Sequence, residues 1–155
     1  MEIKNGSALN SPSDNRIHEF ESFHRVKLPA DFIQLLKQSN GGVTDDLNIE
    51  VDGHSRLVER FLCLLDDPRN DLINGQYEIS VVIAQIEDRL TDDEDQVGAT
   101  LIPFAVLFGG DFLCIDFRLN RSTPTVVLWD HEESDELDPV TYQVADTFNE
   151  FLNRI

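Results

Sequence analysis

The sequence predicts an α+β fold: a single domain with a central, mostly antiparallel twisted sheet, two N-terminal helices, one middle helix and a C-terminal helix. Three observations predict it. The chain has 155 residues, the size of one ordinary domain with a core of its own. Residues 101–132 contain three successive strand patterns, and helical periodicity occurs near both ends of the chain and once between them. We expect the domain to span residues 11–155, and the sequence leaves open whether residues 1–10 are ordered.

The centre of the sheet is expected in the stretch that begins at residue 101. Its three strand segments are rich in β-branched and aromatic residues, and they cover 101–108, 112–117 and 125–129. Gly109-Gly110 supplies a tight turn between the first two, and residues 118–124 form a looser hairpin loop.

Two more strands are predicted earlier in the chain. Apolar and polar residues alternate over 47–51, which is typical of a half-buried strand, and Asp52-Gly53 marks the turn that follows. The continuous apolar run 61–65 predicts a central strand.

The first helix is expected to begin with Ser11 as its cap and Pro12 in its first turn. Its apolar stripe comprises Ile17, Phe20 and Phe23. His18 and His24 flank this stripe, and neither has an acidic or thiol partner at the spacing of metal ligands. We therefore expect both histidines on the helix surface and not in a metal site.

Three further helices are predicted. The second opens at Pro29 and ends at Asn40-Gly41, a pair that commonly stops helices. A middle helix follows from apolar residues at helical spacing over 79–90, although its β-branched residues would also suit a strand. The last helix is expected to begin at Asp138-Pro139, with the aspartate as cap and the proline in the first turn.

Charge is the strongest signal in the composition. The chain holds 30 acidic and 12 basic residues, which gives a formal net charge of −18 at pH 7. Such a chain repels phosphate groups, so we expect no direct binding to nucleic acid or to an anionic membrane, and a basic protein becomes the attractive partner. Acidity that serves solubility alone is the alternative.

The apolar segments point to a cytoplasmic protein. The longest uninterrupted apolar run, residues 101–108, is far shorter than a membrane span. The N-terminal residues lack the basic start and apolar stretch of a secretory signal. Cys63 and Cys114 each lie within an apolar run, which is typical of buried free thiols.

The sequence contains no convincing catalytic, cofactor or metal motif. Asp93 and Asp95 fit the start of a calcium loop, but two later ligand positions hold Val97 and Phe104. His131 begins a run that faintly resembles a zinc helix, yet the second histidine is missing. Neither a nucleophile elbow nor a phosphate loop is present, so we predict that the protein is not an enzyme and needs no cofactor and no metal.

Two acidic segments are the candidates for a binding surface. Residues 87–95 and residues 130–138 each hold six acidic residues and adjoin the central strands. If the sheet brings them together, they form a negative rim around Trp129, and an aromatic anchor inside a charged rim is typical of tight protein interfaces. A core position for Trp129 is the alternative. The residues expected to bind a partner are Asp92, Asp93, Glu94, Asp95, Trp129, His131, Glu132, Glu133, Asp135 and Glu136.

Several short motifs follow one another in a characteristic order. LPADF at 28–32 and Asn40-Gly41-Gly42 lie in the N-terminal half, and LIPFA at 101–105, Gly110-Asp111 and VLWDHE at 127–132 follow in the C-terminal half. This order and spacing resembles the SMI1/KNR4-type domain of the SUKH superfamily over nearly the whole chain.

The chain departs from that family's pattern at two points, and at one of them the connection 118–124 is longer than a simple turn. At the other, Val106-Leu107-Phe108 stands where the family usually has a polar, Gly-containing loop. These apolar residues fit a core position, a shielded strand edge or a dimer contact, and the sequence leaves the three open.

The resemblance implies a function in bacterial competition. Bacterial domains of this type look like immunity proteins, which neutralise a cognate toxin, often a nuclease, by binding it. A nuclease must hold phosphate and is usually basic, so we expect a basic protein toxin that the acidic surface occludes. The alternative, implied by eukaryotic relatives, is a regulatory or scaffolding module that binds proteins and has no toxin partner.

Overall fold

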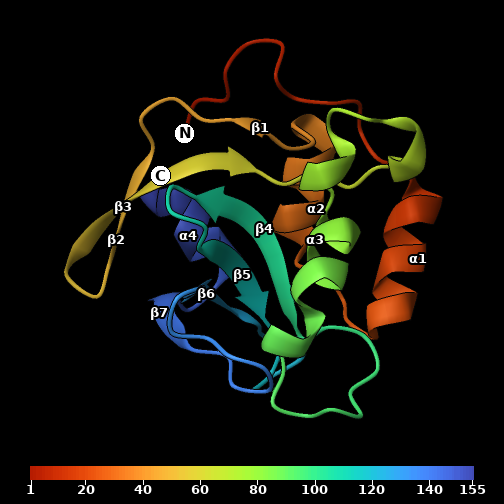
Figure 1. Cartoon of the computed structure of the whole chain (residues 1–155). Coiled ribbons are helices and arrows are strands. Elements are labelled where there is room, and N and C mark those ends of the chain that lie inside the picture. Colours follow the sequence, from red (N-terminus) through yellow and green to blue (C-terminus); the bar gives the residue numbers. More distant parts are fainter.

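The protein is built on a seven-stranded sheet in which all paired strands are antiparallel (Figure 1). This computed structural model describes residues 1–155. The strand order is β1-β3-β4-β5-β6-β7, and β2 pairs with β3 as a hairpin. The strands are β1 (Gly42–Val43), β2 (Asn48–Val51), β3 (His54–Phe61), β4 (Leu101–Leu107), β5 (Phe112–Asp116), β6 (Thr125–Trp129) and β7 (Thr141–Ala145). The predicted α+β class and the three central strands are confirmed.

The chain forms four α-helices: α1 (Asp14–His24), α2 (Ala30–Gln38), α3 (Ile79–Ile86) and α4 (Phe148–Arg154). Three short 3-10 turns complete the list: η1 (Pro68–Asn70), η2 (Gly75–Tyr77) and η3 (Glu87–Arg89). Helix α3 contacts β4 on the sheet face turned toward the viewer in Figure 1, and α4 lies behind the sheet against β6 and β7. None of the helices is both long and apolar enough to cross a bilayer.

The core on the α4 side is centred on Phe104 of β4. Its ring centroid lies 5.2 Å from that of Phe148 and 5.3 Å from that of Phe151, both in α4. Phe32 of α2 joins the cluster at 6.0 Å. All four rings are buried, and full burial of one phenylalanine contributes roughly 1.5–3 kcal/mol. This cluster therefore fixes α2 and α4 to the sheet.

The first helix begins later than predicted. Its cap is Ser13 and not Ser11, because the Ser13 side chain accepts a hydrogen bond from the backbone N–H of Arg16 (3.1 Å). Asp66 accepts a hydrogen bond from the Ser13 hydroxyl (2.5 Å), so a distant loop selects this serine over the other.

The predicted limits of one strand and of the last helix were wrong. The strand expected at 61–65 is β3, which runs from His54 to Phe61 and includes polar residues that the apolar pattern did not indicate. Asp138-Pro139 begins no helix, because residues 141–145 instead pair with the free edge of β6 as β7. Helix α4 starts only after Thr147, whose side chain accepts a hydrogen bond from the N–H of Glu150 (3.0 Å).

His24 is buried, contrary to its predicted place on the helix surface. Only 4% of the residue is exposed, and its Nδ1 accepts a hydrogen bond from the backbone N–H of Ala99 (2.8 Å). Burial disfavours the charged imidazolium and lowers the pKa of His24 to about 4. Helical periodicity did not reveal this, because the cover comes from a loop far along the chain.

The two cysteines are free and buried, as predicted. Burial raises the pKa of the Cys63 thiol to about 12 and also raises that of Cys114. The first ten residues run beside β1, where the N–H of Lys4 donates to the oxygen of Val43 (2.8 Å) and that of Leu9 to the oxygen of Asn40 (3.0 Å).

Candidate functional site

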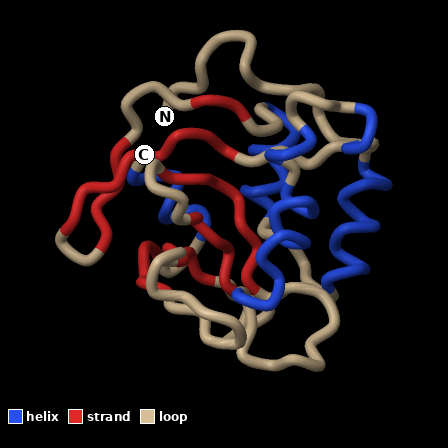
Figure 2. The backbone as a smooth tube through the Cα atoms, in the orientation of Figure 1, coloured by secondary structure: helices blue, strands red, loops and turns tan.

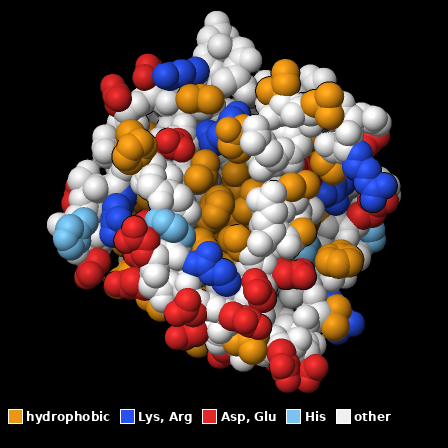
Figure 3. Space-filling model, viewed as in Figure 1, with side chains coloured by type: hydrophobic (Ala, Val, Ile, Leu, Met, Phe, Trp, Pro, Cys, Tyr) orange, Lys and Arg blue, Asp and Glu red, His pale blue; other side chains and the backbone are white.

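The two acidic segments, 87–95 and 130–138, lie next to each other at one end of the sheet. Figure 2 shows the loop that follows α3 beside the loop between β6 and β7. The backbone N–H of Leu137 donates to the oxygen of Asp88 (2.7 Å), which joins the segments directly. Acidic side chains gather over this end of the molecule in Figure 3.

Arg89 connects the two segments further. Its Nη2 donates to the backbone oxygens of His131 and of Ser134, the second at 2.7 Å. Its guanidinium lies 5.0 Å from the ring centroid of Trp129, and its own backbone oxygen accepts a hydrogen bond from Trp129 Nε1 (3.0 Å). One basic residue therefore holds both acidic segments in place through neutral backbone groups, and it forms no ion pair with their carboxylates.

Trp129 lies in the core and not on the surface. Only 1% of the residue is exposed. It is the last residue of β6, pairs with Phe112 and Thr141 in the sheet, and packs its ring 5.9 Å from that of Phe112. The expectation that its ring stands open inside the acidic rim is therefore wrong, and the core alternative is correct.

Eight of the ten residues predicted to bind a partner, all except Trp129 and His131, are acidic, and all eight are exposed. This set comprises Asp92, Asp93, Glu94, Asp95, Glu132, Glu133, Asp135 and Glu136. Asp130 orders the second group, because its Oδ1 accepts hydrogen bonds from the N–H groups of Glu132 and Glu133, both at 2.9 Å. The result is a dense negative surface carried on a defined backbone.

A cavity of about 380 Å³ opens between the two segments. Carboxylates from both of them line it: Glu87, Asp88, Asp93, Glu94 and Glu136. Phe23, His24, Ile83 and Leu90 supply an apolar part of the wall. This acidic cavity suits a long basic side chain, whose stem can pack on the apolar part while its charged end meets carboxylates.

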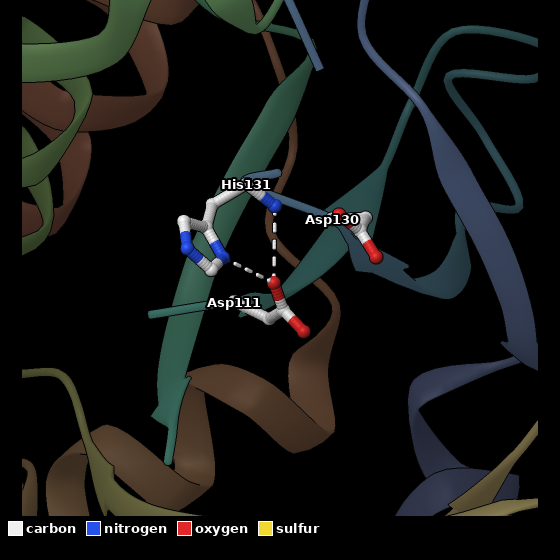
Figure 4. A group of neighbouring side chains, drawn as sticks. All are labelled: Asp111, Asp130 and His131. Carbon is white, nitrogen blue, oxygen red and sulfur yellow. Dashed lines mark hydrogen bonds and ion pairs between the residues drawn. The ribbon is translucent and has the colours of Figure 1, made fainter. Parts of the chain in front are cut away.

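A second group links the end of β6 to the turn between β4 and β5 (Figure 4). Asp111 is 5% exposed, and its Oδ1 accepts hydrogen bonds from the backbone N–H (3.0 Å) and the ring Nδ1 (2.8 Å) of His131. Its Oδ2 lies 3.4 Å from Nη1 of Arg56. His131 therefore points toward Asp111 and fixes the start of segment 130–138.

The same group is the one cluster whose ligand atoms are close enough for a metal ion. Candidate ligand atoms of Asp111, Asp130 and His131 lie within 4.8 Å of one another. Both oxygens of Asp111 already face protein donors, and Oδ1 of Asp130 already accepts two backbone N–H groups. The arrangement is therefore that of a structural hydrogen-bond network.

Arg89 and Asp111 are the residues that sequence reasoning missed. In the sequence, Arg89 falls within the predicted middle helix 79–90, and Asp111 appears only in the Gly110-Asp111 motif. Neither role is visible locally, because the partners of Arg89 are 40 or more positions away and those of Asp111 are 20 or more away.

Comparison with known proteins gives the family of the chain. No curated protein and no solved structure matches it significantly. A family model, SUKH_6, described as SMI1-KNR4 cell-wall, matches residues 14–152, which is nearly the whole chain. The protein therefore belongs to the SMI1-KNR4 (SUKH) family.

Proposed function

We propose that this protein is an immunity protein that binds and neutralises a basic, nuclease-type bacterial toxin through its acidic surface. Two lines support the proposal: membership of the SMI1-KNR4 family, and a net charge of −18 in the chain. The observation that carries it is the acidic cavity, because five carboxylates from two distant segments line one opening of side-chain size.

The mechanism is occlusion. Carboxylates at the cavity stand in for the phosphates of the toxin's substrate, and a lysine or arginine of the toxin's nucleic-acid site enters the cavity. The exposed acids around it raise the rate of encounter by long-range attraction. Nucleic acid is then excluded both by volume and by charge.

The test is a capture experiment with matched variants. The tagged protein serves as bait for a lysate of its native host, with washes at about 0.1 M and then about 0.5 M salt, and retained proteins are identified by mass spectrometry. We expect one dominant basic protein whose toxicity disappears when the two are produced together. Several partners without rescue of toxicity would contradict the proposal and favour a scaffold.

The matched variants assign binding to the cavity. Glu87→Gln, Glu94→Gln and Glu136→Gln together remove the charge of three carboxylates that line the cavity and make no side-chain hydrogen bond or ion pair. The control carries Glu2→Gln, Glu50→Gln and Glu59→Gln, three exposed acids elsewhere, so its net charge is the same. We expect only the first variant to lose rescue; equal loss in both would show that net charge alone acts.

A further inference from the structure

A row of side chains crosses four strands on the α3 side of the sheet. Arg60 of β3 pairs with Val106 of β4, Val106 with Phe112 of β5, and Phe112 with Trp129 of β6. Directly opposed residues of antiparallel strands point to the same face. The four side chains therefore form one continuous band.

Helix α3 and turn η3 leave the middle of this band open. The neighbouring row is covered, since Cys114 and Val127 are buried, whereas Val106 and Phe112 are only half-buried. Figure 3 shows hydrophobic side chains in a hollow over β4 and β5, with basic side chains at its border. We call this hollow, with Arg60, Tyr77, Val106 and Phe112, the open face.

Arg60 at one end of the open face has no acidic partner. Its guanidinium carbon lies 3.7 Å from the ring centroid of Tyr77, which holds the side chain flat. Its Nε is buried without a hydrogen-bond partner, and it takes part in none of the ion pairs of a chain that holds 30 acidic residues. A desolvated donor without an acceptor is costly, so this site favours a ligand that supplies one.

The turn beside the open face adds apolar surface. Phe108 is 71% exposed, while its neighbour Leu107 is buried in the core. The three residues Val106-Leu107-Phe108 thus divide between the open face, the core and the turn. Aromatic residues and arginine are among the residue types that most often dominate binding energy at interfaces.

We propose that the open face binds a segment of a partner protein in which a large apolar side chain lies next to a carboxylate. The apolar side chain packs on Val106 and Phe112, and the carboxylate accepts a bidentate hydrogen bond from Arg60. This chemistry is opposite to that of the acidic cavity, which recognises basic groups. The open face is therefore a second binding surface, independent of the proposed function.

The test uses a displayed library of random short peptides, selected on the wild-type protein at about 0.1 M salt, at which electrostatic contacts persist. We expect enriched peptides to pair Asp or Glu with Phe, Trp or Leu. A synthesised member should shift the amide NMR resonances of Val106 and Phe112 and leave those of residues 92–95 unchanged. The absence of such peptides among those enriched, or a selected acidic peptide that leaves the resonances of Val106 and Phe112 unchanged, overturns the proposal.

Substitutions of Arg60 test its role in binding the peptide. We expect Arg60→Glu to weaken binding of the selected peptide by about tenfold or more, and Arg60→Lys by less, since it keeps the charge but loses the planar fork. Arg69→Glu is the matched control, because Arg69 is exposed, unpaired and outside the face; it should change binding by less than about twofold. Equal effects of both glutamates overturn the proposal, provided that thermal unfolding shows both variants folded.

A second copy of the chain is the competing occupant. Leu72 is 94% exposed and Ile73 76% exposed, and they follow Asp71, so this loop has the required chemistry. Analytical ultracentrifugation of the wild-type protein at several concentrations shows whether it is a monomer or a dimer. A monomer supports a separate partner, and a dimer that Arg60→Glu dissociates overturns it in favour of self-association.

Discussion

Trp129 Nε1 donates a hydrogen bond to the backbone oxygen of Arg89 at 3.0 Å, while the guanidinium of Arg89 lies 5.0 Å from the Trp129 ring. The same guanidinium donates hydrogen bonds to the backbone oxygens of His131 and Ser134. The end of β6, turn η3 and the β6–β7 loop are thus one unit, and both acidic segments depend on it.

Replacing Arg89 tests this unit. Arg89→Ala leaves two backbone oxygens without their donor and removes the cation–π contact, so we expect a loss of about 2 kcal/mol in the free energy of unfolding. Urea unfolding followed by circular dichroism measures it. Arg89→Lys should lose less, since it keeps the charge and one donor. An unchanged midpoint in Arg89→Ala would show that the segments are held in another way.

The burial of Trp129 gives a direct optical prediction. It is the single tryptophan of the chain, so intrinsic fluorescence reports on this position alone. We expect blue-shifted emission and weak quenching by acrylamide in the folded protein, with strong quenching in urea. Efficient quenching in the folded state would restore the surface position that the sequence first suggested.

His24 predicts a stability change with pH. Its pKa is about 4 in the folded state against 6.5 for the ordinary group, so the unfolded chain binds more protons between these values and stability rises with pH there. Lowering the pH from 6.5 to 4 should therefore reduce the free energy of unfolding by roughly 3 kcal/mol through this group alone.

A variant separates His24 from the many carboxylates that titrate nearby. His24→Asn keeps an acceptor for the N–H of Ala99 but cannot be protonated in this range. We expect the free energy of unfolding, measured in urea at several pH values, to fall less steeply for His24→Asn than for the wild type below pH 6.5. Parallel curves would assign the acid sensitivity to other groups.

Association with a basic partner should depend on salt. Because exposed carboxylates attract the partner at long range, we expect the association rate to fall by about tenfold or more between low and high salt, with a smaller change in the dissociation rate. Stopped-flow mixing measures both. The variant with Glu87→Gln, Glu94→Gln and Glu136→Gln should show a shallower dependence, and a rate that is insensitive to salt contradicts electrostatic steering.

Local patterns predicted much of the fold. The strands β4, β5 and β6 follow from β-branched and aromatic runs, and the turn between the first two follows from Gly109 and Gly110, whose φ angles of 101° and 100° only glycine adopts readily. Periodicity likewise predicted α2 and α3. The start of α4 was misplaced, because Asp138-Pro139 is a good local cap while the open edge of β6 recruits residues 141–145 as a strand.

The sequence by itself determined the α+β class, the central strands, the strong negative charge and the family pattern, because each depends on composition or on neighbours a few positions apart. Only the tertiary structure decided that segments 87–95 and 130–138 share one cavity, that Trp129 is buried beneath Arg89, and that Arg60 lies unpaired beside an open sheet face. These features depend on contacts between residues that are distant along the chain. Such contacts form only when packing of the whole core selects one arrangement, so no local pattern encodes them.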